Sequence, residues 1–166
     1  MKLEGRAHKY GADVNTDVII PARYLQSDDH AFWVAHCMED IDTEFVKRVI
    51  PGDFIVATTN FGCGSSREQA PIVIKGIGVS CVIASSFARI FFRNAINIGL
   101  PILECPEASE AAAMGDDLTV DLATGDICNL TKRRTFHAKP YSDFMMGIIE
   151  KGDLIAYTRA RFKVKG

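Results

Sequence analysis

A loop rich in glycine, serine and arginine carries the residue types in this sequence that are best suited to chemistry. It runs Asn60-Phe61-Gly62-Cys63-Gly64-Ser65-Ser66-Arg67-Glu68, between an apolar run and a predicted helix. Glycines let the backbone approach a ligand closely, and free N–H groups at the start of a helix attract anions. An arginine can hold a carboxylate through two parallel hydrogen bonds. The loop therefore predicts recognition of an acidic small molecule.

Two other interpretations of this loop remain alongside the first. Ser65 and Glu68 have the spacing of a capping box, in which the serine would do no more than start a helix. Against this, Pro71 would lie inside such a helix and disrupt it, so we expect the regular helix to begin close to Pro71. Cys63 could be a thiolate nucleophile if the helix start and Arg67 lowered its pKa, although no histidine lies near it in the sequence.

The segments around the loop have the spacing of an α/β fold. Apolar runs predict strands at 54–57, 79–84 and 101–104. Apolar residues at helical spacing predict helices, over 43–49, up to about residue 75, and over 87–98. We expect Ser85 and Ser86 to cap the last of these helices, and Gly99 and Pro101 to end it. The loop follows a strand, where open α/β sheets place their ligand sites.

The segments on either side of this middle part differ from it. Before it, the polar run at 11–17 predicts a turn that leads into a short strand over 18–20. After it, residues 106–116 are expected to form a looser connection. Two short alternating runs around Ala123-Thr124-Gly125 then predict a β-hairpin.

The last part of the sequence predicts one helix followed by extended structure. Apolar residues over 141–151 have helical spacing, and Gly152 stands where it would end that helix. Residues 153–157 are expected to form a strand, and 159–165 an extended basic tail. The charges of the tail are typical of a solvated edge strand protected from aggregation, with a docking strip for an acidic partner as the alternative.

Composition and charge exclude several classes of protein. The 166 residues, 48% apolar and 24% charged, predict one folded domain over residues 1–166. A net charge of −2 supplies no overall attraction for nucleic acid, which would depend on Lys132-Arg133-Arg134 and the basic tail alone. Because no apolar run is long enough to span a membrane and the first residues lack a secretory signal, we expect a cytoplasmic protein.

The cysteines and histidines are too scattered to predict a metal site. The five cysteines are Cys37, Cys63, Cys81, Cys105 and Cys128, and no two of them form a C-x-x-C pair. Their odd number and wide spacing argue against a disulfide framework and against a self-contained zinc or iron–sulfur site. We therefore expect this chain to bind no metal.

Three further segments extend the loop motif into a resemblance to a known family. They read NTDVIIPARYL at 15–25, SFARIF at 86–91 and NAINIGL at 94–100. With the loop at 61–68, they resemble the swivelling domain of the aconitase superfamily, and with the chain length they resemble its isopropylmalate dehydratase small subunits. The resemblance is dense over 11–103 and looser beyond. It implies an α/β fold of the three-layer β/β/α swivelling type.

The resemblance implies a hydro-lyase that isomerises a 2-hydroxy di- or tricarboxylate by removing water and adding it back. A [4Fe–4S] cluster, a Lewis acid for the departing hydroxyl, is expected in a separate large subunit, with which this chain would form a heterodimer or heterotetramer. Ser65 is the implied general base, and Ser66 and Arg67 are implied to bind a substrate carboxylate. Gly64, the loop amides and Arg67 would supply the field that stabilises a serine alkoxide.

The resemblance also implies that Tyr24-Leu25-Gln26-Ser27 reads the variable arm of the substrate. In the family, apolar residues after Tyr-Leu suit an isopropyl group, and an arginine suits an additional carboxylate. Gln26 is neutral, which argues against homoaconitate, while Gln26-Ser27 is more polar than an isopropyl pocket favours. Isopropylmalate is therefore the leading substrate, with 2,3-dimethylmalate, methylmalate or citraconate, and homoaconitate as alternatives.

Two further points bear on function. Gln69 stands where the family commonly has histidine, so that position keeps its hydrogen bonding but loses titration near neutral pH. A hypothesis of another class is a non-catalytic module whose glycine loop captures a carboxylate or phosphate. Such a module would bind its ligand alone and would not depend on an iron–sulfur protein.

Overall fold

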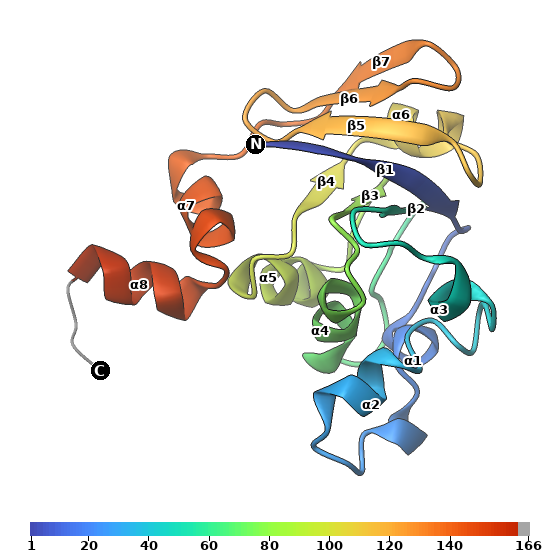
Figure 1. Cartoon of the computed structure of the whole chain (residues 1–166), viewed down its shortest axis with the longest axis vertical. Helices are drawn as coiled ribbons and strands as arrows, with labels where there is room; N and C mark the ends of the chain where they lie inside the picture. The colour runs from blue at the N-terminus through green and yellow to red at the C-terminus, as the bar shows by residue number, and fades with distance from the viewer. Residues whose placement is uncertain (163–166) are drawn as a thin grey trace.

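The computed structural model describes residues 1–162 and is built on one curled sheet (Figure 1). Its strands are β1 (Lys2–Lys9), β2 (Phe54–Ala57), β3 (Cys81–Ala84), β4 (Ile102–Glu104), β5 (Asp117–Asp121), β6 (Asp126–Asn129) and β7 (Arg134–His137). The seven strands lie in the order β4-β3-β2-β1-β5-β6-β7. Strands β1 to β4 pair in parallel, whereas β5 to β7 are antiparallel, with β1 joining the two halves.

Helices complete the layers of the fold. They are α1 (Thr16–Ile19), the 3-10 turn η1 (Ala22–Tyr24), α2 (His30–Val34), α3 (Phe45–Arg48), α4 (Gln69–Gly76), α5 (Arg89–Asn97), α6 (Pro106–Ala111), α7 (Asp143–Lys151) and α8 (Leu154–Phe162). Helices α4 and α5 lie against the parallel strands, and the antiparallel half curls over the far side of those strands (Figure 1). The β/β/α layering expected from the resemblance is therefore confirmed.

The parallel half confirms the predicted middle part of the sequence. Every residue of β2 and β3 is buried, as expected of strands covered on both faces. Gly99 with a φ of 69° follows α5, and Gly152 with a φ of 96° ends α7, as predicted. The hairpin around Ala123-Thr124-Gly125 is confirmed by the pairing of β5 with β6.

The predicted strand at 18–20 is wrong, because Val18 and Ile19 lie in the capped helix α1 and Ile20 is its C-cap. Asn15 is the N-cap of α1, and its side-chain oxygen accepts a hydrogen bond from the backbone N–H of Val18 at 3.1 Å. Ile19 and Ile20 are fully buried, so they are apolar because they lie in the core and not because they form a strand. The helix is too short for a periodic pattern to reveal it.

The predicted strand at 153–157 is also wrong, because the chain continues as helix α8 from Leu154 to Phe162. The expected extended basic tail is helical as far as Phe162, and its remaining residues lie outside the described part. Gly152 therefore separates two helices, α7 and α8, and not a helix from a strand.

Two predicted loop features are wrong as well. Neither Ser85 nor Ser86 caps α5, whose N-cap is Ala88 without a side-chain bond. Instead, the Ser86 hydroxyl accepts from the N–H of Asn60 at 2.8 Å, and Ser85 bonds the hydroxyl of Ser109. The looser connection expected at 106–116 contains helix α6, which begins with a proline at its first position.

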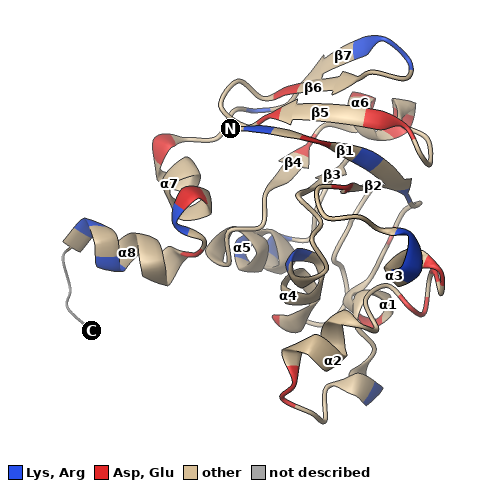
Figure 2. Ribbon diagram, viewed as in Figure 1, with Lys and Arg blue, Asp and Glu red and all other residues tan. Residues whose placement is uncertain are grey.

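Charged residues are interspersed over the sheet and the helices in Figure 2. Basic segments stand out at the start of β7, where Arg134 follows Lys132 and Arg133, and on α8. Over residues 1–162, no helix is long and apolar enough to cross a bilayer.

Candidate functional site

The loop after β2 is held in place by the segment that precedes α1. The N–H of Gly62 donates to the carbonyl of Val14 at 2.8 Å, and the N–H of Thr16 donates to the carbonyl of Cys63 at 2.9 Å. These two bonds form a short parallel bridge between segments almost fifty positions apart in the sequence. The segment at 13–17 is therefore part of the same site as the loop.

A second bridge fixes the loop against the start of α5. Phe61 donates its N–H to the carbonyl of Ser86 at 3.0 Å, and the N–H of Ala88 donates to the carbonyl of Phe61 at 2.9 Å. Gly62 has a φ of 79°, and a Cβ built there would lie 2.2 Å from Cγ of Phe91. Only glycine therefore lets the loop pass this close to α5.

The side chain of Ser65 is exposed, whereas its backbone carbonyl is held by hydrogen bonds. Its carbonyl oxygen accepts from the hydroxyl of Thr16 at 2.9 Å and from the N–H of Arg67 at 2.7 Å. Thr16 itself is only 2% exposed, so this contact is shielded from water. Gly64, Ser65 and Ser66 are all exposed, with Gly64 at a φ of 89°. The side of the site that these three residues present to solvent is therefore not covered by this chain.

The capping-box interpretation of Ser65 is wrong. Helix α4 begins at Gln69, and its N-cap Glu68 makes no side-chain capping bond. Pro71 is the third residue of α4, which confirms that the regular helix begins close to it. The residues from Gly62 to Glu68 are therefore left as an irregular loop, as the anion-binding interpretation requires.

Arg67 is the most constrained charged side chain of the site. Its Nη2 lies 2.6 Å from Oδ1 of Asp17, and its Nη1 donates to the carbonyl of Ile20 at 2.7 Å. The Arg67 side chain is 13% exposed, whereas that of Asp17 is 61% exposed. The guanidinium is thus oriented before any ligand arrives, and it keeps further N–H donors for an anion.

Sequence reasoning missed the contribution of Thr16 and Asp17 to this site. Both belong to the polar run at 11–17, which was assigned only a turn that leads into a strand. A signal was present in the polar Asn15-Thr16-Asp17 run, because such residues bond backbone and cationic groups at helix starts. What the sequence lacked was the pairing that brings this run against the loop.

The hypothesis of a reactive thiolate at Cys63 required a lowered thiol pKa, whereas in the structure this pKa is raised. Burial raises the pKa of the Cys63 thiol, and the carboxylate of Asp13 raises it further. The backbone carbonyl of Cys63 accepts from the N–H of Thr16, and a raised thiol pKa disfavours a catalytic thiolate.

The segment expected to read the substrate follows directly after α1. Tyr24 and Leu25 are partly buried, Gln26 is exposed and Ser27 is partly buried. The segment begins four residues after Ile20, whose carbonyl holds Arg67. The segment therefore lies close along the chain to a residue that binds Arg67.

The side chains of residues 1–162 do not fit a metal or an iron–sulfur cluster. No three His, Cys, Asp or Glu side chains among them lie close enough together to share an ion. The cysteines at 37, 63, 81, 105 and 128 are free thiols, and three of them are fully or almost fully buried in the core. The donor set for a cluster is therefore absent from this part of the chain.

Comparison with known proteins gives consistent matches along the whole chain. The aconitase C-terminal domain family matches residues 16–108, which include α1 and the loop. The 3-isopropylmalate dehydratase small subunit of Clostridium beijerinckii is 60% identical over 161 residues, 97% of this chain and 100% of that protein. The 2,3-dimethylmalate dehydratase small subunit of Eubacterium barkeri is 56% identical over 163 residues, 98% of this chain and 100% of that protein.

A solved structure matches the fold as closely. The crystal structure of 3-isopropylmalate dehydratase from Methanocaldococcus jannaschii has a TM-score of 0.92 and 45% sequence identity, covering 98% of this chain and 96% of that one. By these matches the chain belongs to the aconitase C-terminal domain family and, within it, to the dehydratase small subunits.

Proposed function

We propose that this chain is the small subunit of a 3-isopropylmalate dehydratase-type hydro-lyase. In this proposal it helps to interconvert 2-isopropylmalate and 3-isopropylmalate by removing water and adding it back. The observation that carries the proposal is the exposed Ser65 on a loop fixed by Thr16, two residues before Arg67, whose guanidinium is oriented by Asp17 and Ile20. A single swivelling domain over 1–166 and a cytoplasmic location remain predictions.

Ser65 acts as the general base in this proposal. Its hydroxyl oxygen takes a proton from the substrate carbon next to a carboxylate, which requires that the alkoxide be stabilised. The backbone at Gly64 is exposed and has a φ of 89°, so a ligand can approach it from solvent. Positive charge from Arg67 adds to the field that favours the alkoxide.

Ser66 and Arg67 bind a substrate carboxylate in this proposal. Asp17 and Ile20 use one N–H from each terminal nitrogen of the Arg67 guanidinium, which holds its plane in one orientation. The remaining donors can meet the two oxygens of a carboxylate, a geometry that a lysine could not provide. Asp17 also supplies the negative charge that faces the guanidinium when no anionic substrate is bound.

The large subunit supplies the other half of the site. Gly64, Ser65 and Ser66 are exposed, so a substrate lying on them would have its opposite side uncovered. We assign the [4Fe–4S] cluster to the large subunit, since the residues described here do not fit one. The assembly would be a heterodimer or a heterotetramer.

The charge and polarity of Gln26 and Ser27 are the basis on which we propose the preferred substrate. A neutral, modestly polar pair does not offset a third carboxylate, which places isopropylmalate ahead of homoaconitate. A relative named for 2,3-dimethylmalate is almost as similar as those named for 3-isopropylmalate, so 2,3-dimethylmalate remains the main alternative.

The proposal is tested by anaerobic reconstitution with the iron–sulfur large subunit. Turnover of 2-isopropylmalate, 2,3-dimethylmalate, methylmalate and homocitrate would be followed by the absorbance of the unsaturated product. We expect no turnover by either subunit alone, and the highest kcat/KM of the complex on 2-isopropylmalate. Carboxylate binding by the isolated chain, with no turnover by the complex, would instead favour a non-catalytic anion-binding module.

A further inference from the structure

A cluster of stacked and charged side chains holds the start of the segment 24–27 from outside the proposed site. The rings of Tyr24 and His36 are stacked, with centroids 3.7 Å apart and planes 7° apart. The Tyr24 hydroxyl donates to Oε1 of Glu39 at 3.0 Å, and Nδ1 of His36 pairs with the other oxygen of Glu39. We call Tyr24, His36 and Glu39 the Tyr24 clamp.

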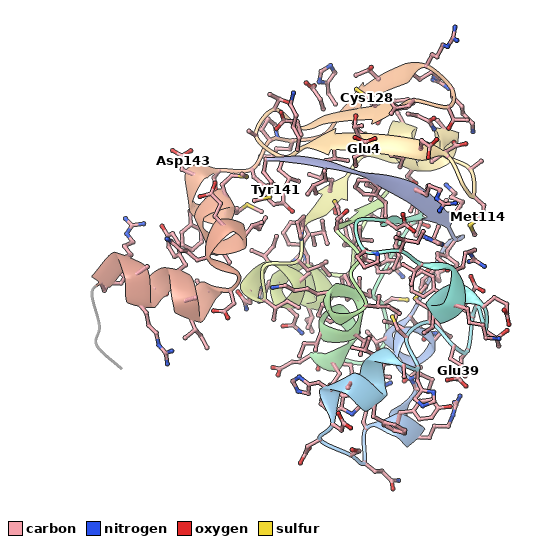
Figure 3. The ribbon with its side chains drawn as sticks, in the orientation of Figure 1. Glu4, Glu39, Met114, Cys128, Tyr141 and Asp143 are labelled. Atoms are coloured by element: carbon pink, nitrogen blue, oxygen red, sulfur yellow. The ribbon has the colours of Figure 1, made fainter. Side chains whose placement is uncertain are left out.

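Two neighbouring charges reinforce the Tyr24 clamp. The guanidinium carbon of Arg23 lies 4.6 Å from the centroid of the Tyr24 ring, within range of a cation–π contact. The same guanidinium binds both carboxylate oxygens of Asp40, at 2.8 and 2.5 Å. Figure 3 shows Glu39 at the end of the molecule formed by α1 and α2, away from the sheet.

The other end of the segment is held independently. Nε1 of Trp33 donates to the carbonyl of Ser27 at 2.7 Å, and the N–H of Asp29 donates to the Ser27 hydroxyl at 3.1 Å. Trp33 is only 6% exposed, so this anchor is built on the core. Between the two anchors, Gln26 is the exposed residue.

The Tyr24 clamp lies too close to the surface for its main effect to be on global stability. The His36 side chain is 25% exposed and that of Glu39 is 35% exposed. Exposed ion pairs contribute about 0–1 kcal/mol to folding, since water screens them. The clamp does, however, fix the conformation of a short turn, which is a local effect.

We propose that His36 is a positioning residue that sets substrate selectivity, by locking Tyr24 through ring stacking and through Glu39. This inference rests on the proposed function, in which the segment 24–27 reads the variable arm of the substrate. Selectivity between alkyl groups depends on the contacts that the enzyme makes with them, and the Tyr24 clamp holds one of the residues proposed to make those contacts. The contacts of Thr16 with Ser65 and of Arg67 with Ile20 do not involve the clamp, so we expect the chemical step at Ser65 to be unaffected.

The test compares variants of the reconstituted complex on two substrates that differ by one methylene, 2-isopropylmalate and 2-ethylmalate. His36→Ala removes both the stack and the partner of Glu39, whereas His36→Phe keeps a stacked ring. His137→Ala is the matched control, because His137 also pairs with a carboxylate, that of Asp126 at 2.6 Å, but lies on β7 at the far edge of the sheet.

We expect His36→Ala to raise KM for 2-isopropylmalate about 2- to 10-fold, as the loss of an aromatic stack predicts, with kcat within twofold. The ratio of kcat/KM for the two substrates should fall. His36→Phe should recover part of both losses, and His137→Ala should match the wild type. If the His36→Ala variant does not assemble with the large subunit, the His36→Phe and Tyr24→Phe variants replace it in the test. Smaller increases in KM are then expected.

Three results would overturn the inference. The first is unchanged KM and selectivity in the His36 variants. The second is a fall in kcat with unchanged selectivity, which indicates a general structural defect. The third is a wild-type complex with no turnover on either substrate, which contradicts the proposed function and the inference together, whereas the first two leave the proposed function intact.

Discussion

The buried hydroxyl of Thr16 donates to the carbonyl oxygen of Ser65 at 2.9 Å and so fixes the loop that carries the proposed base. The donor lies on α1 and the acceptor on the loop after β2, so two distant segments meet at the site. Thr16 is 2% exposed, and the bond is therefore protected from competition by water.

Replacing Thr16 by valine should weaken catalysis without unfolding the chain. Valine keeps the shape of threonine but removes this donor, so the Ser65 carbonyl keeps only the N–H of Arg67, a loss of about 0.5–1.5 kcal/mol. We expect kcat of the reconstituted complex to fall about 2- to 10-fold, whereas Thr16→Ser should keep most of the activity. Steady-state kinetics of both variants check this, and a Thr16→Val enzyme with normal kcat would show that the bond does not position Ser65.

Arg67→Lys should mainly impair substrate binding. A lysine cannot hold Asp17 and Ile20 while also offering a fork to a carboxylate, so we expect KM to rise about tenfold or more. Arg134→Lys, at the start of β7, is the control and should be unchanged. Unaltered kinetics in Arg67→Lys would refute carboxylate binding by this residue.

Gly62→Ala should destabilise the chain. The backbone there has a φ of 79°, and the added Cβ would lie 2.2 Å from Phe91. Strain and overpacking together predict a loss of about 2–4 kcal/mol in the free energy of unfolding. Urea denaturation measures this, with Gly11→Ala as the control, because nothing lies within 4 Å of a Cβ built at Gly11. Equal stability of the two variants would contradict the close approach of the loop to α5.

Asp53 should contribute to stability at neutral pH and lose that contribution in acid. Burial alone would raise its pKa, but hydrogen bonds from His8 at 2.8 Å and from the N–H groups of Arg6 and Ile50 outweigh burial and lower the pKa. A carboxyl whose pKa is lower folded than unfolded stabilises the fold above its unfolded pKa, about 4, and loses this as pH falls through the folded pKa.

Asp53→Asn should therefore cost about 1–3 kcal/mol at pH 7, with the difference from the wild type shrinking as pH falls below about 4. Urea denaturation of both proteins across this range checks the sign. A difference that grows as the pH falls would contradict the assignment.

Much of the parallel half could be predicted from the sequence, because its signals are local. The apolar runs at 54–57 and 81–84 form strands that are buried along their whole length, and Pro71 fixes the start of α4 through its own ring. The glycine-rich loop between them was likewise identified from residue type and position.

The rest could not be predicted, because it depends on contacts made at long range. The apolar run at 18–20 gives no sign that Asn15 caps a helix there, nor that Arg67 binds the carbonyl of Ile20. Helix α8 has no buried residues, so no apolar stripe distinguishes it from a strand. Strand β7 exists because its residues pair with β6 in a register that only the folded sheet defines.

The proposed role of Ser65 is tested most directly by Ser65→Ala in the anaerobically reconstituted complex. A lost general base predicts a fall in kcat of about 10²- to 10⁴-fold, with assembly on the large subunit unchanged by size-exclusion chromatography. Exchange of the substrate carbon-bound proton with solvent should be lost in parallel. Turnover within tenfold of the wild type, with that exchange intact, would show that Ser65 is not the base.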